Sequence, residues 1–262
     1  MSAVPEHLRK VLAVVPTLGE RTDTLGPALA SLTAQDGVEC TVVVVAPEDA
    51  VEARRIAVAH GGLVVDDPGR GLGAAVNAGI AAARDERYFA WIGDDDAMRP
   101  GGLRTLVGLL ERAPDAVVAY GGCEYMNHEG HVFAISRLGR LATWVLPWGP
   151  DLIPQPASLT RLDHLRAVGP FDESLRFVMD LDMFLRLRRR GRFVSTRHPV
   201  ATYRWHPDAL TVANRDLSIH EAEQVKRRHL PPPLAKLAWA WDLPVRTSIR
   251  IVSRRLTAKA RP

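Results

Sequence analysis

Short apolar runs alternate with segments of helical periodicity along the first half of the chain. Val11–Val15 and Thr41–Val45 are continuously aliphatic or β-branched, which is typical of strands buried on both faces, and a proline follows each within two residues. Further strands are predicted at residues 63–65, 88–92 and 116–120, and helices at 22–32, 48–60, 71–84 and 101–112. This alternation predicts an α/β fold with a doubly wound, mostly parallel sheet and helices on both faces.

The pattern changes after Gly121-Gly122. A hairpin is predicted from residues 123–126 and 132–135, and an irregular segment rich in Trp and Pro follows at 144–156. Helices at 162–168 and 180–190 precede strands near Phe193 and at 201–205, which we expect to rejoin the sheet. We therefore predict one domain, residues 1–230, with halves at 1–120 and 121–230.

Composition supports a globular protein in a reducing compartment. The 262 residues are 47% hydrophobic and 24% charged, which is enough apolar material for a large domain. Cys40 and Cys123 lie in strand-like contexts without the spacing of metal ligands, so neither a disulfide framework nor a zinc site is expected. The apolar run at the N-terminus is too short for a signal or a membrane span. These features predict a cytoplasmic location.

Pro231-Pro232-Pro233 marks the start of a basic tail, residues 231–262. The tail has seven Lys or Arg residues and one acid, Asp242, so its net charge is +6, whereas residues 1–230 sum to −2. Four apolar residues share one helical face beside a basic stripe: Val245, Ile249, Val252 and Leu256, with Arg246, Arg250 and Arg254.

Two interpretations of the tail are open. The helix lies on an anionic membrane, which would place the protein at the inner face of the cell membrane, or it packs on the domain or on a second subunit. Nucleic acid is not an expected partner, because residues 1–230 carry no excess of basic charge. The sequence leaves the oligomeric state open.

Three consecutive carboxylates, Asp94, Asp95 and Asp96, follow the strand predicted at 88–92. Adjacent carboxylates at a strand end repel one another, and a divalent cation with oxygen ligands would neutralise them. The alternative is a solvated acidic turn in which Asp96 caps the helix that Pro100 opens.

Polar residues follow three of the predicted strands. Pro16-Thr17 comes after the first strand, Arg70 to Asn77 after the third, and the three aspartates after the fourth. Ligands of open α/β sheets bind beyond the carboxyl ends of the strands, so these segments are expected to line one cleft. Gly71–Val76 matches only part of a dinucleotide-binding motif and follows the wrong strand, which disfavours a dehydrogenase.

Taken in order, the motifs of the chain resemble those of the inverting family 2 glycosyltransferases of GT-A fold. The matching segments are Val14–Thr17, Gly71–Gly79, Gly93–Gly101, Gly169–Glu173, Met179–Leu187 and Tyr203–His206. The resemblance implies that residues 1–120 bind a nucleotide sugar and that residues 121–230 bind the acceptor. It also implies that the aspartate cluster holds Mn²⁺ or Mg²⁺ on the donor diphosphate.

The resemblance assigns roles to individual residues. Asp180 is the expected catalytic base, and Asp96, Asp94 and His206 are the expected metal ligands. The residues expected to bind the nucleotide sugar are Pro16, Thr17, Arg70, Gly73, Asn77, Asp94 and Asp95. Asp182 points about 200° away from Asp180 on a helix and is predicted to pair with Arg186 instead.

This chain departs from the family pattern at two places. The turn at Ala46-Pro47 lacks the aspartate that recognises the base in many members, and Met179 replaces an acidic residue that often precedes the catalytic aspartate. Trp144, Trp148 and Gln155 are candidates for a sugar or acceptor platform.

The sequence thus predicts a metal-dependent inverting glycosyltransferase of polysaccharide, cell-envelope glycan or glycolipid biosynthesis. Its partners would be a nucleotide-diphosphate sugar and a hydroxyl acceptor: a sugar, a lipid-linked glycan or a small molecule. One alternative is a catalytically silent nucleotide-sugar-binding or scaffolding protein. A nucleotidylyltransferase is disfavoured, because Pro16–Arg21 does not form the glycine-rich basic loop that such an enzyme requires.

Overall fold

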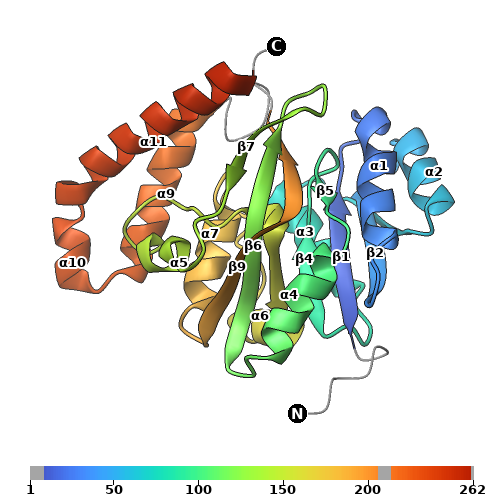
Figure 1. Ribbon diagram of the computed structural model, residues 1–262, viewed down its shortest axis with the longest axis horizontal. Helices are drawn as coiled ribbons and strands as arrows, with labels where there is room; N and C mark the ends of the chain where they lie inside the picture. Colours follow the sequence, from blue (N-terminus) through green and yellow to red (C-terminus); the bar gives the residue numbers. More distant parts are fainter. Residues whose placement is uncertain (1–8, 206–213, 261–262) are drawn as a thin grey trace.

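One continuous sheet runs through the molecule, with helices on both of its faces (Figure 1). The computed structural model describes residues 9–205 and 214–260. Its nine-stranded sheet has the order β3-β2-β1-β4-β8-β6-β9-β5, and β7 pairs with β6. The strands are β1 (Lys10–Pro16), β2 (Glu39–Ala46), β3 (Leu63–Asp66), β4 (Tyr88–Trp91), β5 (Ala97–Met98), β6 (Ala116–Met126), β7 (Val132–Ser136), β8 (Ser158–Arg161) and β9 (Arg192–Arg204).

The first half of the chain forms the parallel part of the sheet, as predicted. β1 pairs in parallel with β2 and β4, and β2 pairs in parallel with β3. The connecting helices are α1 (Thr22–Thr33), α2 (Val51–Ala59) and α3 (Leu72–Ala81). Alternate residues of β1 enter different cores, since Val11 packs with α1 and α4 (Gly102–Glu111) whereas Leu12 packs with α3 and α7 (Met179–Leu187). Burial on both faces explains the continuous apolar run in this strand.

The centre of the sheet contains a strand that the sequence pattern did not predict. β8 lies between β4 and β6 and is antiparallel to both. Its polar Ser158 and Thr160 are buried, so the segment lacks the apolar run or alternation that marks a strand. The structure therefore corrects the prediction that the fifth strand, at 116–120, simply extends the parallel βαβ series.

β6 continues through Gly121-Gly122 instead of ending there. A Cβ atom on Gly121 would lie 2.5 Å from Val200 Cγ2, and one on Gly122 would lie 2.8 Å from the Ser136 carbonyl oxygen. These glycines therefore permit the close approach of neighbouring strands rather than a turn. The predicted hairpin is confirmed as β6–β7, and the two strands expected near residues 193 and 201–205 are one long strand, β9, parallel to β6.

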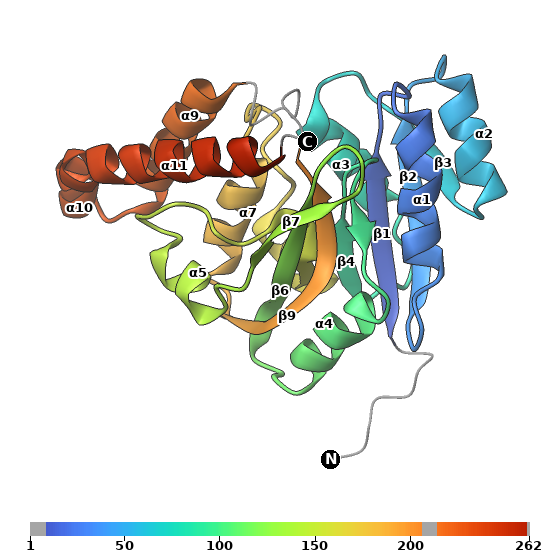
Figure 2. The same ribbon diagram turned by 45° about the horizontal axis from the view of Figure 1, so that its top comes forward.

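The helices of the second half cover the face of the sheet on which α7 lies, and the tail wraps around their outer side (Figures 1 and 2). They are α5 (Arg140–Val145), α6 (Leu162–Val168), α7, α9 (Arg215–His229), α10 (Pro232–Leu237) and α11 (Trp239–Ala260), with a 3₁₀ turn at Gln155–Ala157. α9, which the sequence analysis did not predict, packs on α7 and contributes Val225 to the core.

The tail helix α11 lies against α9. Arg246 pairs with Glu223 at 2.8 Å and Arg250 with Asp216 at 2.9 Å, and both acids belong to α9. Val245, Ile249 and Leu256, from the apolar face predicted in the sequence, are half-buried, while Val252 is 54% exposed. The structure thus matches the interpretation in which this face packs on the domain. Within residues 9–205 and 214–260, no helix combines the length and apolarity needed to span a membrane.

Candidate active site

The three consecutive aspartates lie buried at the carboxyl end of β4, next to the end of β1. Asp94, Asp95 and Asp96 are each at most 9% exposed. Thr17, which directly follows β1, donates a hydrogen bond from Oγ1 to Asp94 Oδ2 at 2.6 Å. The guanidinium of Arg21 lies 3.2 Å from Asp94 and 3.3 Å from Asp95. The structure therefore brings Thr17 and the aspartates together as predicted, and it adds Arg21, which sequence reasoning missed although it lies in the same loop.

Asp96 is held by backbone groups on both sides. Its Oδ1 accepts a hydrogen bond from Arg204 N at 3.0 Å, and its Oδ2 accepts one from Gly93 N at 3.3 Å. Arg204 also donates from Nε to the Asp95 carbonyl oxygen at 3.2 Å, so the end of β9 closes over the cluster. The alternative in which Asp96 caps the next helix is wrong, because α4 begins after Gly101 and no side chain caps it.

Burial disfavours the ionised form of two carboxyls in this cluster. Burial, followed by the charge of Asp95, raises the pKa of Asp96 to about 8. Burial also raises the pKa of Asp94, against the opposing effects of Thr17 and Arg21. Arg21 is the guanidinium that pairs with Asp94 and Asp95, and Arg204 donates to the Asp95 carbonyl oxygen rather than to a carboxylate. Each Asp96 oxygen keeps a lone pair beyond its single backbone donor. The residues present thus fit a hard divalent cation with oxygen ligands.

No group of three or more His, Cys, Asp or Glu side chains with the arrangement of a metal site occurs in the described part of the chain. Asp94 and Asp96 would therefore be only part of a coordination shell that a diphosphate and water complete. His206, the third predicted ligand, lies outside the described residues.

The segment after β3 is joined to the second half of the chain by an ion pair and hydrogen bonds. Arg70 pairs with Glu173 at 3.1 Å. Asn77 both donates to the Phe171 carbonyl oxygen at 3.0 Å and accepts from Phe171 N at 2.9 Å. A Cβ on Gly73 would lie 3.4 Å from the Asp172 carbonyl oxygen. These predicted donor-binding residues thus join the two halves of the domain, and the side-chain amide of Asn77 is already used for this purpose.

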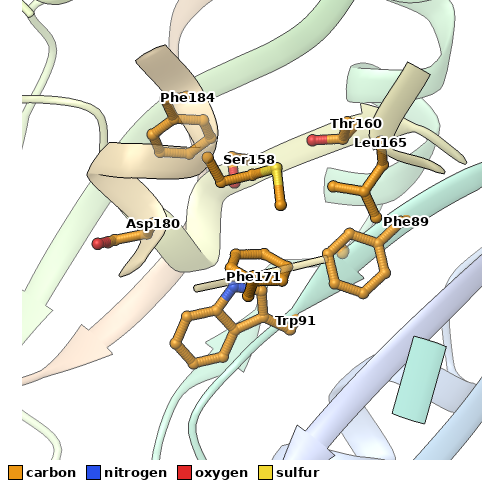
Figure 3. A pocket seen from close by; sticks show the side chains of 10 residues that line it. Phe89, Trp91, Ser158, Thr160, Leu165, Phe171, Asp180 and Phe184 are labelled. Carbon is orange, nitrogen blue, oxygen red and sulfur yellow. The ribbon is translucent and has the colours of Figure 1, made fainter. Parts of the chain in front are cut away.

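Asp180 lies in the first turn of α7, at the margin of an apolar pocket (Figure 3). The pocket is lined by Phe89, Trp91 and Phe171, and Figure 3 shows the Asp180 carboxyl turned away from the rings of Phe89 and Phe171. Burial raises the pKa of Asp180 to about 6, and the charge of Glu221 adds to this effect. A carboxylate with this pKa is ionised at neutral pH, yet it is more basic than an exposed aspartate.

Asp182, two residues further along, has the structural role predicted for it. Its carboxylate binds Arg186 at 2.8 Å and His229 Nε2 at 2.8 Å. Although burial raises the pKa of Asp182, His229 and Arg186 hold it below the usual range. Asp182 therefore anchors α7 to the end of α9, whereas Asp180, at the margin of the pocket, takes no part in these bonds.

Helix α9 supports the start of α7 with a carboxylate that sequence reasoning missed. Glu221 accepts hydrogen bonds from the backbone N–H groups of Arg176, Phe177 and Val178, at 2.9, 2.7 and 3.0 Å. These groups immediately precede α7, so Glu221 caps the helix that carries Asp180. No sequence signal marks this role, because the partners are more than forty residues apart.

A second carboxyl, that of half-buried Asp151, lies close enough to Asp180 for the charge of Asp180 to affect its ionisation. Burial and the charge of Asp180 raise the pKa of Asp151 to about 7. Lys226 of α9 donates a hydrogen bond to the Gly149 carbonyl oxygen beside it. Gln155, a predicted platform residue, instead donates to the Trp91 carbonyl oxygen at 2.5 Å, and the rings of Trp144 and Trp148 pack edge to face against each other.

Comparisons with known proteins agree with this architecture. The succinoglycan biosynthesis protein ExoO of Rhizobium meliloti (strain 1021) is 36% identical over 132 residues, which is 48% of this chain and 37% of that protein. An uncharacterized glycosyltransferase of Rickettsia prowazekii (strain Madrid E) is 25% identical over 171 residues, covering 62% of this chain and 54% of that protein. The chain thus matches only about a third to a half of the length of these relatives.

The structure of S. aureus TarS residues 1–349 in complex with UDP-GlcNAc has the same fold. It superposes with a TM-score of 0.67 at 14% identity and covers 89% of this chain and 71% of that chain. The predicted GT-A architecture is therefore confirmed. The model of the family described as glycosyl transferase family 2 matches residues 12–152, slightly more than half of the chain. The chain belongs to glycosyl transferase family 2.

Proposed function

We propose that this protein is a metal-dependent, inverting glycosyltransferase that moves a sugar from a nucleotide-diphosphate sugar to a hydroxyl acceptor. One observation carries the proposal: two different acidic sites border the same short segment. Asp94 to Asp96 directly follow this segment, Trp91–Gly93, while Asp180 lies at the margin of the apolar pocket that Trp91 also lines. A metal-bound leaving group and a general base are the two functions that the transfer requires.

The aspartate cluster is the proposed donor end of the site. Asp96 and Asp94 would hold Mn²⁺ or Mg²⁺, which supplies charge neutralisation to the departing nucleoside diphosphate. Thr17 and Arg21 fix the orientation of Asp94, and Arg204 closes the cluster from β9. Pro16, Asp95 and the segment from Arg70 to Asn77 are the further proposed donor contacts.

Asp180 is the proposed general base. Its carboxylate would accept the proton of the acceptor hydroxyl while the oxygen attacks the anomeric carbon from the face opposite the nucleotide. The bond to the leaving phosphate breaks on the other face, so the product has the inverted configuration. A positioned base of this kind contributes roughly 10²–10⁴-fold to the rate.

The relatives support a choice of substrate class. The name of ExoO assigns it to succinoglycan biosynthesis, and TarS has been crystallised with UDP and with UDP-GlcNAc. We therefore propose exopolysaccharide synthesis, with a UDP-sugar as the donor and a growing glycan as the acceptor. The inner face of the cell membrane is the corresponding proposed location.

Thermal-shift measurements with UDP-, dTDP- and GDP-sugars, each with and without Mn²⁺, test the donor side, because a ligand that binds the native state raises the melting temperature. We expect a UDP-sugar to stabilise the protein only with the metal, and Asp96→Ala to remove this effect while the protein stays folded. Equal stabilisation of the folded Asp96→Ala variant would contradict the metal site.

The configuration of the product, read by NMR, tests the mechanism. An inverted anomeric centre, together with loss of turnover but not of donor binding in Asp180→Asn, is the expected result. A retained configuration would refute the proposed role of Asp180. A donor that binds in the presence of metal but never turns over with any acceptor would favour the silent binding protein, an alternative that Met179 next to Asp180 keeps open.

A further inference from the structure

The outer side of the tail has a composition that its packing against α9 does not explain. α11 is a 22-residue helix, so it is about 33 Å long, and it crosses one side of the molecule (Figure 2). Its inner face contains Val245, Ile249, Ser253 and Leu256, which fall within an arc of about 80°. Each of these residues is buried or half-buried. Three of the four apolar residues that the sequence places on one face, Val245, Ile249 and Leu256, are therefore used for packing, while Val252 stays exposed.

Large apolar side chains also occupy the outer side. Trp239, Leu243 and Ile251 are 70%, 67% and 46% exposed and fall within an arc of about 120° on α11. The short helix α10, immediately before α11, adds Leu234 and Leu237 at 45% and 52% exposure. Single exposed apolar residues are normal on soluble proteins. With Val252, six such side chains lie on two consecutive helices, which indicates a surface that contacts something less polar than water.

The charged residues on the side of the tail that faces α9 are paired with residues of α9. The acid Asp242 turns inward, where it pairs with Arg227 of α9 and keeps only 13% of its side chain exposed. Arg246 is also turned inward and is neutralised by Glu223.

The charged residues on the outer side of the tail are basic. Lys236, Arg254, Arg255 and Lys259 are exposed, and among the described residues none of them pairs with a carboxylate. Arg254 falls inside the same arc as Trp239 and Ile251, at the edge where it and Arg250 border a hollow beside the start of α9.

We propose that this outer surface, made by Leu234, Leu237, Trp239, Leu243, Ile251 and Arg254 with the flanking basic residues, docks on an anionic lipid bilayer. Leucine and tryptophan side chains would enter the interface between headgroups and acyl chains while the cations contact the headgroups. Nucleic acid would satisfy the cations and leave the exposed leucines in water. A protein partner with acidic and apolar groups is the competing occupant, and the experiment below separates it from lipid.

The placement of the tail suits the proposed transferase. α11 contacts β7, which pairs with β6, and the ends of β6 and β9 are joined by the bond from Trp205 N to the Met126 carbonyl oxygen. Arg204, next to Trp205, closes the aspartate cluster. Figure 1 shows the C-terminal end of α11 at the same end of the molecule as the β6–β7 hairpin. Docking would therefore bring a lipid-borne acceptor close to the site. This consequence rests on the proposed function, whereas the binding to lipid does not.

Co-sedimentation of the full-length protein with vesicles tests the proposal. Vesicles of phosphatidylglycerol and phosphatidylcholine are compared with vesicles of phosphatidylcholine alone, at low and high salt. We expect partition onto the anionic vesicles, weakened by salt because the cations are exposed. Arg254→Glu with Arg255→Glu, and separately Trp239→Ala with Leu243→Ala, should each lower the partition coefficient by about tenfold or more.

Matched control variants make the same kinds of substitution outside the tail. Arg104→Glu with Arg112→Glu reverses two exposed charges, one on α4 and one directly after it, and Val51→Ala with Val58→Ala removes two exposed apolar side chains from α2. Both should bind vesicles like the unaltered protein, and all variants should keep their circular dichroism spectra. Equal partition of the tail variants and the controls would overturn the proposal. So would a tail variant that changes the oligomeric state in light scattering without changing its partition, since the surface would then be a protein interface.

Discussion

Glu221→Gln tests whether α9 sets the properties of the proposed base. The substitution removes one negative charge while keeping the length of the side chain and one acceptor oxygen. The carboxylate accepts three backbone hydrogen bonds from the residues before α7. At a partly exposed site each such bond contributes about 1 kcal/mol net. The amide retains part of this capacity, so we expect a loss of about 1–2 kcal/mol in the free energy of unfolding, which lowers Tm by a few degrees.

The charge has a separate kinetic effect. Burial raises the pKa of Asp180 to about 6, and the charge of Glu221 contributes to the rise. Removing this charge lowers the pKa of Asp180, so the base stays ionised at more acidic pH. The acid limb of the profile of kcat/KM against pH should move to lower pH in Glu221→Gln. The affinity for the donor should stay unchanged, because the aspartate cluster is not touched.

Glu223→Gln is the control for this experiment. It makes the same chemical change two residues further along α9, where the carboxylate binds Arg246 of the tail. This variant should lose stability and keep the acid limb of the unaltered protein. Turnover would be measured with the donor and acceptor found in the substrate screen, and Tm by calorimetry. If Glu221→Gln lost stability while its acid limb stayed in place, or if both variants shifted the limb equally, Glu221 would be a structural residue only.

Three further outcomes follow from the structure. Asp180→Asn should raise Tm above pH 6. In the native protein, ionising a carboxyl whose pKa rises from 3.8 to about 6 on folding costs up to about 3 kcal/mol of stability, and the variant avoids this loss; the difference disappears below about pH 4. An unchanged Tm at pH 8 would contradict the burial of this group. Thr17→Val removes the bond to buried Asp94 and should cost about 1–3 kcal/mol in stability and weaken metal-dependent donor binding, measured by calorimetry. Gly121→Ala places a Cβ 2.5 Å from Val200 Cγ2 and should destabilise by about 1–3 kcal/mol in denaturant melts.

Local and periodic features of the chain could be predicted from the sequence. The apolar run of β1 follows from burial on both faces, which any buried parallel strand requires, and it was predicted without knowledge of its neighbours. The pair of Asp182 and Arg186 was predicted for a similar reason, because residues four apart on a helix are neighbours whatever surrounds them. The convergence of Thr17 with Asp94 required only the rule that the carboxyl ends of parallel strands meet at one edge.

Other features depended on contacts between distant segments. β8 has no strand pattern of its own, and it became a strand because β4 and β6 present open edges on either side of it. Glu221 caps α7 only because α9 packs there, and a cap supplied from another helix leaves no trace in the sequence around the capped end. Arg204 reaches Asp95 and Asp96 because β9 runs parallel to β6, a pairing over long sequence separation.

The tail shows most clearly which features the sequence determined and which the tertiary structure decided. Its sequence determined that a helix with an apolar face would form, because periodicity depends only on the geometry of one helix. The sequence alone did not determine what this face meets, since α9 and a lipid surface offer the same apolar surroundings. The tertiary structure decided it by placing Glu223 and Asp216 opposite Arg246 and Arg250, so that packing also pairs half-buried Arg246 with buried Glu223 and exposed Arg250 with exposed Asp216. This packing left Trp239 and Leu243 on the outside, because they lie off the face that the periodicity had identified.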